Sequence, residues 1–318
     1  MQKDASKVVV LGTGGTIAGL RSAQEHGGYR AGQLGVDRLL AQLPAAVAVD
    51  VETRQLAQID SKDADAAFWQ LLATGVAAQL ARAEVRAVVV THGSDTLEES
   101  AYLLHRVLAP AKPVVFTAAM RPADAVQADG PRNLADALTL ATTPVATGVL
   151  VVMAGSVHAA PGLRKLHLHR LDPFDSVDAG PLGRIADGRF IAQRPWPAGA
   201  ALGLRAIERP AAGWPRVAIV LSHAGADGGV VDALLAQPPA QRVAGLIAAG
   251  TGSGTLHAGL EAALRRAQQA GVVVRRSSRC GGVVGDSADA LPAARAATPV
   301  QARIDLLLEL LMRDEAPA

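Results

Sequence analysis

Short runs of apolar residues recur along the chain, and each run ends in small or polar residues. The runs cover residues 8–11, 87–90, 114–117, 148–153, 217–221, 246–249 and 272–274. Runs this short and this continuous are typical of strands that are covered on both faces, as in a parallel α/β sheet. The pattern therefore predicts a mostly parallel sheet whose strands alternate with helices.

Helical periodicity appears between these runs. After 87–90, four apolar residues fall on one stripe of a predicted helix: Leu97, Ala101, Leu104 and Leu108. Asp95 and Glu98 have the spacing of an N-cap and its N3 partner at the start of that helix. Further helix starts are predicted at Pro131 and after GTGSGTLHAGL at 250–260.

One stretch divides the chain. In residues 194–216, prolines and glycines replace any periodicity. We expect a linker over 195–215, between an N-terminal α/β catalytic domain of residues 1–194 and a C-terminal α/β domain of residues 216–318. The expected fold class is α/β, with a doubly wound, mostly parallel sheet in the larger N-terminal domain.

Composition narrows the classes of function. Apolar residues make up 50% of the 318 residues and charged residues 19%, which excludes a disordered chain. Four Phe, three Trp and two Tyr offer little material for stacking on nucleic acid bases. The 31 basic and 29 acidic residues form no basic cluster, so we expect no nucleic-acid partner.

Cys280 is the only cysteine, which excludes an internal disulfide and fits a reducing compartment. The first ten residues lack the apolar core of a signal peptide, and no run approaches the roughly 20 apolar residues of a membrane helix. We therefore expect a cytoplasmic protein without a membrane partner, although a trimmed export signal would leave the same sequence.

The loops that follow the strands are the place to look for chemistry, because ligands of doubly wound sheets bind beyond the carboxyl ends of the strands. The first loop, GTGGTIAG at 12–19, lacks the third glycine of a dinucleotide motif, since Ile17 stands there, and lacks the lysine of a phosphate-binding loop. A dinucleotide-binding protein stays open as an alternative. The other interpretation is that the glycines bring backbone close to a substrate and present Thr13 and Thr16.

Hydroxyl, carboxylate and amine groups also follow the predicted strands. Thr16, Ser94, Asp95 and Lys165 supply the groups that nucleophilic catalysis needs, because an alcohol is a weak nucleophile until a neighbour takes its proton. The structural alternatives are a cap or turn role for Thr16, an N-cap role for Asp95 and a solvated Lys165.

Four motifs carry a resemblance to a known family: LGTGGTIAG, THGSDTLEESAYLL, AAMRPADAVQADGPRNL and RSSR. In this order and spacing, from Val8 to about Arg279, the chain resembles the bacterial-type L-asparaginases and glutaminase-asparaginases. The resemblance implies that Thr16 is the nucleophile and that Tyr29, from a mobile flap, helps to activate it. The glycine-rich stretch 21–28, just before Tyr29, has the composition of a lid. The alternative is that Tyr29 is an ordinary surface residue.

The resemblance also implies a second cluster, made of Ser94, Asp95 and Lys165. Ser94 stands where the family has threonine and keeps the hydroxyl, whereas the residues around Lys165 differ from the family's. In the family, the residue matching Asp95 also binds the substrate α-amino group, and the residue matching Ser61 binds the α-carboxylate.

Further substrate contacts are implied at Gly15 and Ala119. Position 62 departs from the family, because Lys62 stands where a neutral residue is usual. Its amine could contact the substrate carboxylate or face solvent.

The family completes each site with residues of a neighbouring subunit, which implies a homo-oligomer of close dimers, such as a homotetramer. Asp286 or Asp289 could supply the acidic group, and Ser253 is a possible further contact. His158, His167 and His169 lie close in sequence, but no carboxylate or cysteine stands at ligand spacing. We expect no metal and no cofactor.

The implied reaction is the conversion of L-asparagine to L-aspartate and ammonia through a threonine acyl-enzyme. A glutaminase-leaning enzyme would share every motif. An amidotransferase subunit acting on charged tRNA would share the fold, but no appended domain is seen in the 318 residues.

Overall fold

The computed structural model describes residues 6–24, 28–43, 49–288 and 290–313. The chain divides into two compact units between Leu204 and Arg205. The division falls inside the stretch 195–215, and the limits of the linker and of the two domains stay a prediction.

Within the described residues, the larger unit is built on an eight-stranded sheet. Its parallel part, in spatial order, consists of β4 (Val51–Ile59), β1 (Lys7–Gly14), β5 (Val85–Thr91), β6 (Val114–Thr117) and β7 (Val149–Met153). Antiparallel pairing then adds β8 (Ser156–Ala159), β11 (Gly183–Ala186) and β12 (Arg189–Ala192). The predicted α/β class with a mostly parallel sheet is confirmed.

Strand β1 lies at the point where the strand order reverses. The chain passes from β1 to β4 on one side, and then to β5, β6 and β7 on the other. In open α/β sheets this arrangement leaves a crevice at the carboxyl ends of the strands, where ligands bind. The loops that follow β1, β4, β5 and β6 all open at that edge.

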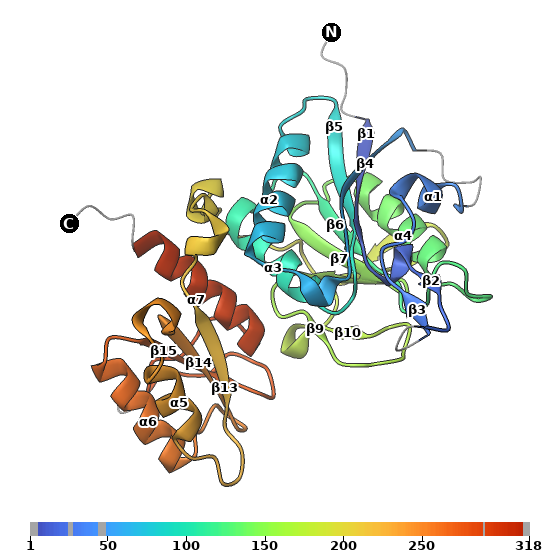
Figure 1. Ribbon diagram of the computed structural model, residues 1–318. Helices are drawn as coiled ribbons and strands as arrows, with labels where there is room; N and C mark the ends of the chain where they lie inside the picture. The colour runs from blue at the N-terminus through green and yellow to red at the C-terminus, as the bar shows by residue number, and fades with distance from the viewer. Residues whose placement is uncertain (1–5, 25–27, 44–48, 289, 314–318) are drawn as a thin grey trace. The chain divides into compact units, whose positions relative to one another are not determined.

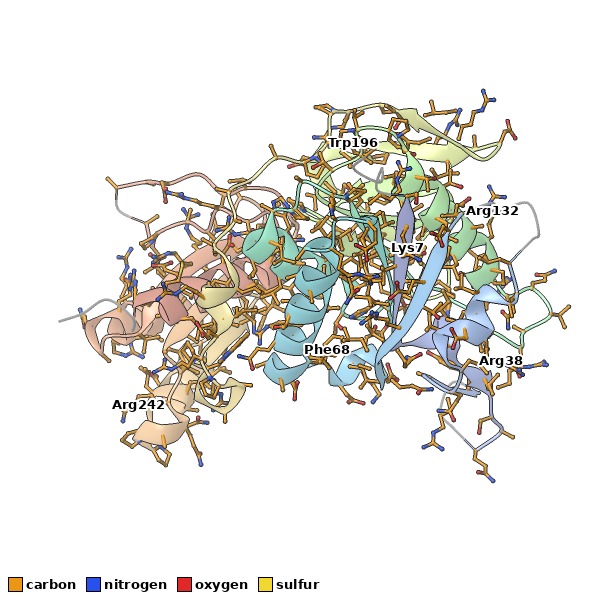
Figure 2. All side chains as sticks on the ribbon, turned by 90° about the horizontal axis from the view of Figure 1, so that it is seen from above. Lys7, Arg38, Phe68, Arg132, Trp196 and Arg242 are labelled. Carbon is orange, nitrogen blue, oxygen red and sulfur yellow. The ribbon has the colours of Figure 1, made fainter. Side chains whose placement is uncertain are left out.

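Helices cover both faces of this sheet (Figure 1). Helices α1 (Val36–Leu40) and α4 (Gly130–Thr142) lie on one face, and α2 (Ala66–Leu80) and α3 (Leu97–Leu108) on the other. Successive strand residues point to opposite faces, so Val8 and Val10 share a core with Leu134 and Leu138 of α4. Charged side chains such as Arg132 stay on the exposed side of that helix (Figure 2).

Two local features differ from the sequence-based expectations. Strand β4 was not predicted, because it is an edge strand whose partly exposed residues interrupt the apolar run. The expected N-cap role of Asp95 is wrong: Thr96 occupies the N-cap of α3 and makes no side-chain capping bond. The carboxylates of Asp95 and Glu98 instead bind Lys165.

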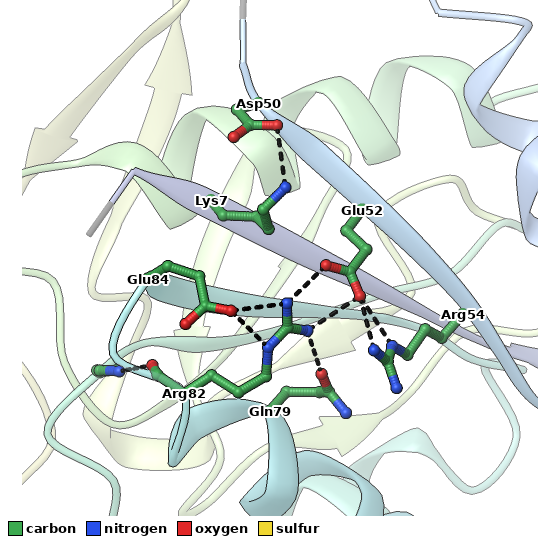
Figure 3. Close-up of polar contacts among 8 residues, drawn as sticks. Lys7, Asp50, Glu52, Arg54, Gln79, Arg82 and Glu84 are labelled. Carbon is green, nitrogen blue, oxygen red and sulfur yellow. Dashed lines mark hydrogen bonds and ion pairs between the residues drawn. The ribbon is translucent and has the colours of Figure 1, made fainter. Parts of the chain in front are cut away.

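A polar network ties the strands together at their amino ends (Figure 3). Arg82, between α2 and β5, donates to both carboxylate oxygens of Glu52 on β4, at 2.7 and 2.9 Å, and also contacts Glu84. Hydrogen bonds from Arg82 and then Arg54 lower the pKa of Glu52 to about 2. Lys112 donates to the carbonyls of Leu80 and Arg82, which caps the carboxyl end of α2. This network therefore lies at the end of the sheet opposite the crevice.

The smaller unit has its own core. Its described residues form a parallel sheet of β13 (Val217–Leu221), β14 (Gly245–Gly250) and β15 (Val273–Ser278). Helices α5 (Gly229–Leu235) and α6 (Ala258–Gln269) pack on one face, and α7 (Pro299–Arg313) on the other (Figure 1). No helix among the described residues is both long and apolar enough to cross a membrane.

Candidate active site

Two glycines shape the loop that follows β1. Gly14 and Gly15 have φ angles of 103° and 78°, which favour glycine. A Cβ atom on Gly15 would lie 2.4 Å from the Cα of Gly93, and one on Gly14 would lie 2.3 Å from the carbonyl oxygen of Ile59. The backbone after β1 therefore packs closely against Gly93, after β5, and against Ile59, at the end of β4.

Thr16 comes directly after this contact and opens a short 3₁₀ helix, Thr16–Ala18. Its side chain is buried, and its Oγ1 shares a hydrogen bond of 2.9 Å with the hydroxyl of Tyr29. Tyr29 lies on β3 (Tyr29–Arg30), which pairs with β2 (Leu20–Arg21). Of the predicted lid, residues 25–27 lie outside the described residues.

A second polar cluster forms where β5 leads into α3. Lys165 Nζ donates to Ser94 Oγ at 2.9 Å and forms an ion pair with Asp95 Oδ1 at 2.6 Å. Ser94 is buried, whereas the Asp95 side chain is 54% exposed and therefore open to a ligand. Lys165 comes from β9 (Arg164–Lys165), which pairs with β10 (Phe174–Asp175) outside the main sheet. The fold thus brings together three residues that the sequence analysis had grouped.

Ser61 follows β4 and lies against the β5 loop. A Cβ atom on Gly93 would lie 2.4 Å from Ser61 Oγ, so only glycine leaves room for this serine. Ser61 Oγ is buried and has no hydrogen-bond partner among the described residues. A buried hydroxyl without a partner carries a desolvation cost that a ligand can remove, which makes this oxygen a candidate substrate contact.

Lys62 lies beside Ser61 but turns to the surface. Its Nζ forms an ion pair of 2.6 Å with Asp63, and both side chains are mostly exposed. The hydrogen bond to Asp63, supported by Asp60 and Asp95, raises the pKa of Lys62. In this structure the ammonium is therefore paired with a neighbouring carboxylate at the rim of the site.

Sequence reasoning missed His92, which supports the β5 loop from behind. Its ring is fully buried between Phe68 and Phe116, and this burial lowers its pKa to about 4. The neutral ring can donate from Nδ1 to the carbonyl oxygen of Gly93, 2.8 Å away. That bond orients the peptide between Gly93 and Ser94.

Asp129 and Asn133 were also missed as supporting residues, although both lie within the quoted motif that ends in GPRNL. Asp129 accepts hydrogen bonds from the backbone N–H groups of Met120 and Arg121, both at 2.9 Å. Asn133 donates to the carbonyl oxygen of Ala118. The two side chains thus fix the loop after β6, in which Ala119 is buried.

In the smaller unit, the candidate residues make local contacts. Ser253 is exposed, and its carbonyl oxygen accepts from Arg276. Asp286 accepts a hydrogen bond of 2.8 Å from the backbone N–H of Ala293, whereas Asp289 lies outside the described residues.

Two of the three histidines considered as metal ligands lie next to a serine and an arginine. His158 Nδ1 lies 2.7 Å from Ser176 Oγ, and His167 Nε2 lies 3.3 Å from a nitrogen of Arg170. Across the described part of the chain, no group of three or more His, Cys, Asp or Glu residues is arranged to hold a metal ion.

Comparison with known families gives matches to both units. The model described as Asparaginase, N-terminal, matches residues 7–197. The model described as Glutaminase/Asparaginase C-terminal domain matches residues 216–316.

Individual proteins are similar over most of the chain. A probable periplasmic L-asparaginase of Haemophilus influenzae is 33% identical over 279 residues, which cover 87% of this chain and 78% of the relative. A glutaminase-asparaginase of Pseudomonas fluorescens biotype A is 33% identical over 86% of this chain and 75% of its own length. The crystal structure of a probable cytoplasmic L-asparaginase from Campylobacter jejuni, also 33% identical, matches with a TM-score of 0.85 over 96% of this chain and 95% of that one.

The close contact between Gly15 and Gly93 predicts that alanine destabilises the protein more at Gly15 than at Gly180, which has no close neighbours. Gly15→Ala forces a Cβ atom into the backbone of Gly93, whereas Gly180, with φ of 68°, has no atom within 4 Å of its would-be Cβ. Both glycines combine a positive φ with a ψ near 180°, a conformation that other residues avoid. We expect Gly180→Ala to lower the free energy of unfolding by roughly 1 to 3 kcal/mol, the cost of this backbone conformation alone, and Gly15→Ala to lower it clearly further because of the added backbone clash. Urea denaturation of both variants measures the difference, and equal losses would show that the β1 and β5 loops can separate freely.

Proposed function

Because this chain belongs to the asparaginase family and is an amidohydrolase, we propose that it converts L-asparagine to L-aspartate and ammonia through an acyl-enzyme on Thr16. The observation that carries the proposal is the 2.9 Å contact between Thr16 Oγ1 and the Tyr29 hydroxyl, at the carboxyl end of β1. A hydroxyl paired with a second oxygen at the ligand-binding edge of the sheet has the arrangement of an activated nucleophile.

In the acylation step, Thr16 Oγ1 attacks the carbon of the substrate side-chain amide. The Thr16 proton passes to the Tyr29 oxygen, while the Tyr29 proton moves on to the departing nitrogen. The carbon–nitrogen bond breaks, ammonia leaves, and an ester links the substrate to Thr16. Water then attacks the ester, releases the carboxylic acid and returns the proton to Thr16.

The second hydroxyl at the site is that of Ser94, and its partner for proton transfer is Lys165. Lys165 Nζ donates to Ser94 Oγ, so a proton can move from Lys165 through Ser94 to the reacting atoms, and the amine that remains can later take a proton back by the same route. Asp95 holds the Lys165 ammonium through a 2.6 Å contact and thereby sets the direction of its remaining hydrogens.

Backbone N–H groups supply the stabilisation of negative charge. The Gly93–Ser94 peptide is oriented by His92 and lies at the entry to α3, where N–H groups lack helical partners. An N–H donor aimed at a developing oxyanion contributes roughly 3 to 4 kcal/mol to catalysis.

Substrate binding uses the polar groups around this centre. The partnerless Ser61 hydroxyl suits the α-carboxylate, and the exposed carboxylate of Asp95 suits the α-ammonium. Lys62 stands at the rim, where it can reach the substrate carboxylate only by exchanging its ion pair with Asp63. The backbone at Ala119, in the loop that Asn133 holds, contacts the side-chain amide. The Pseudomonas relative is named for both amides, so L-glutamine is the second candidate substrate.

We further propose a cytoplasmic location. The exposed free thiol of Cys280 is compatible with a reducing compartment, and the Campylobacter relative is described as cytoplasmic. The Haemophilus relative is described as periplasmic, so fractionation of cells with a compartment marker decides the matter.

We expect the purified chain to release ammonia from L-asparagine in the presence of EDTA, because each proposed catalytic group is an oxygen or a lysine nitrogen. Parallel assays with L-glutamine and D-asparagine measure the preference. Loss of all activity on chelation, restored by zinc, would refute the metal-free route.

Thr16→Ala is expected to lower kcat by on the order of 10³ or more, because one member of a cooperating group is lost. Thr139→Ala, which removes a hydroxyl bonded within α4, is the matched control and keeps kcat near that of the parent. After reaction with a reactive acyl analogue of asparagine, mass spectrometry is expected to find an adduct on Ser94→Ala and none on Thr16→Ala. The reverse pattern would move the nucleophile to Ser94.

We also propose a homo-oligomer of close dimers in which a neighbouring subunit completes each site. The proposal rests on the resemblance to the asparaginases, in which a neighbouring subunit supplies residues to each site. Light scattering at assay concentration is expected to give at least a dimer, and a fully active monomer would overturn the proposal.

A further inference from the structure

Glu98 lies behind the Ser94 cluster and has no role in the reaction described so far. It stands in the first turn of α3, three residues after Asp95. Its Oε2 accepts a hydrogen bond of 2.5 Å from the backbone N–H of Lys165. One carboxylate therefore joins the helix that begins beside Ser94 to the chain segment that carries the lysine.

Lys165 needs such a link, because its strand is not part of the main sheet. β9 contains two residues and pairs only with the equally short β10 within the described residues. In that pairing, the neighbouring Leu166 donates its N–H to Pro173, while the N–H of Lys165 turns to Glu98. The Glu98 contact thus fixes the Lys165 backbone against α3. From that position the Lys165 side chain reaches Ser94.

We propose that Glu98 is a positioning residue, which holds the Lys165 backbone so that Nζ reaches both Ser94 Oγ and Asp95 Oδ1. The proposal rests on the proposed function, in which Lys165 moves a proton. The side-chain contacts of 2.9 and 2.6 Å leave little tolerance, since a hydrogen bond weakens steeply once its geometry departs from the optimum.

The charge of Glu98 adds a pH dependence. Burial raises the pKa of Glu98 to about 7, opposed by the hydrogen bond from Lys165. Glu99 on α3 raises this pKa as well, while Arg164 and Lys165 on β9 lower it, and Asp175 of β10 lies opposite Arg164 in the register. Below that pKa the carboxyl is neutral, and above it the bond to Lys165 becomes charge-assisted and about twice as strong. Turnover is therefore expected to rise with pH through the neutral range.

The first measurement compares kcat, KM and the pH profile of Glu98→Ala, Glu98→Gln and the control Glu261→Gln. Glu261 pairs with Arg265 on α6 of the smaller unit, so the control makes the same chemical change elsewhere. We expect Glu98→Ala to lower kcat about tenfold or more, with KM for L-asparagine changed by less than about threefold. Glu98→Gln keeps an acceptor oxygen, so it is expected to retain most of the low-pH turnover and to lose the rise through neutral pH.

The second measurement does not depend on activity. Reductive methylation followed by peptide mass spectrometry gives the reactivity of Lys165 relative to Lys7, which lies at the other end of the sheet and contacts Asp50. We expect Glu98→Ala to raise this ratio severalfold, because the released amine no longer bonds to Ser94 and Asp95, and Glu261→Gln to leave it unchanged.

The two measurements separate the two proposals. A parent protein that releases no ammonia from either amide would refute the proposed function, while the labelling ratio still judges Glu98. An unchanged ratio in Glu98→Ala, or a neutral-pH rise that persists in Glu98→Gln, would overturn the positioning role. If Glu98→Ala fails to fold, the pH profile and labelling of Glu98→Gln decide, with a ratio like the parent's and a flat profile expected.

Discussion

The approach of two backbones, at Gly15 and Gly93, is the constraint on which the site depends. A side chain at either position would meet backbone or the Ser61 hydroxyl within 2.4 Å. Because these loops leave adjacent strands, the approach sets Thr16 after β1 near Ser94 after β5, and it leaves Ser61 packed against the same glycine. The hydroxyl groups of Thr16, Ser61 and Ser94, which follow three different strands, are thus brought together because Gly15 and Gly93 have no side chains.

Hydrogen bonds from buried side chains behind the loops support this arrangement. His92 holds the Gly93 carbonyl from a fully buried ring, and Asp129 with Asn133 fixes the loop after β6. Most ion pairs of the parallel strands lie instead at their amino ends, around Arg82 and Glu52. At the carboxyl ends, Lys165 is paired with Asp95 and lies 2.9 Å from Ser94 Oγ, so its charge acts on that hydroxyl at short range.

The parts of the fold that could be predicted are those where burial on both faces leaves a continuous apolar run, as in β5 and β6. Strand β4 escaped because an edge strand mixes exposed and buried positions. In the site, Thr16 and Ser94 follow predicted strands and were found from that position. The contact between Ser94 and Lys165 spans 71 residues, and no local pattern encodes it. Glu98 had the spacing of a helix cap, but its carboxylate binds a strand residue far along the chain, and only the tertiary fold decides between these partners.

Serine at position 94 has a physical consequence for the whole cluster. A threonine side chain is stiff at χ1 because its Cβ is branched, whereas a serine hydroxyl turns among its rotamers at little cost. The direction of Ser94 Oγ must then be set by its partner, which is Lys165 Nζ at 2.9 Å. Lys165 is in turn set by Asp95 at its amine and by Glu98 at its backbone. In this chain the direction of the Ser94 hydroxyl is therefore set by two carboxylates, Asp95 and Glu98, which act through Lys165, and not by the serine itself.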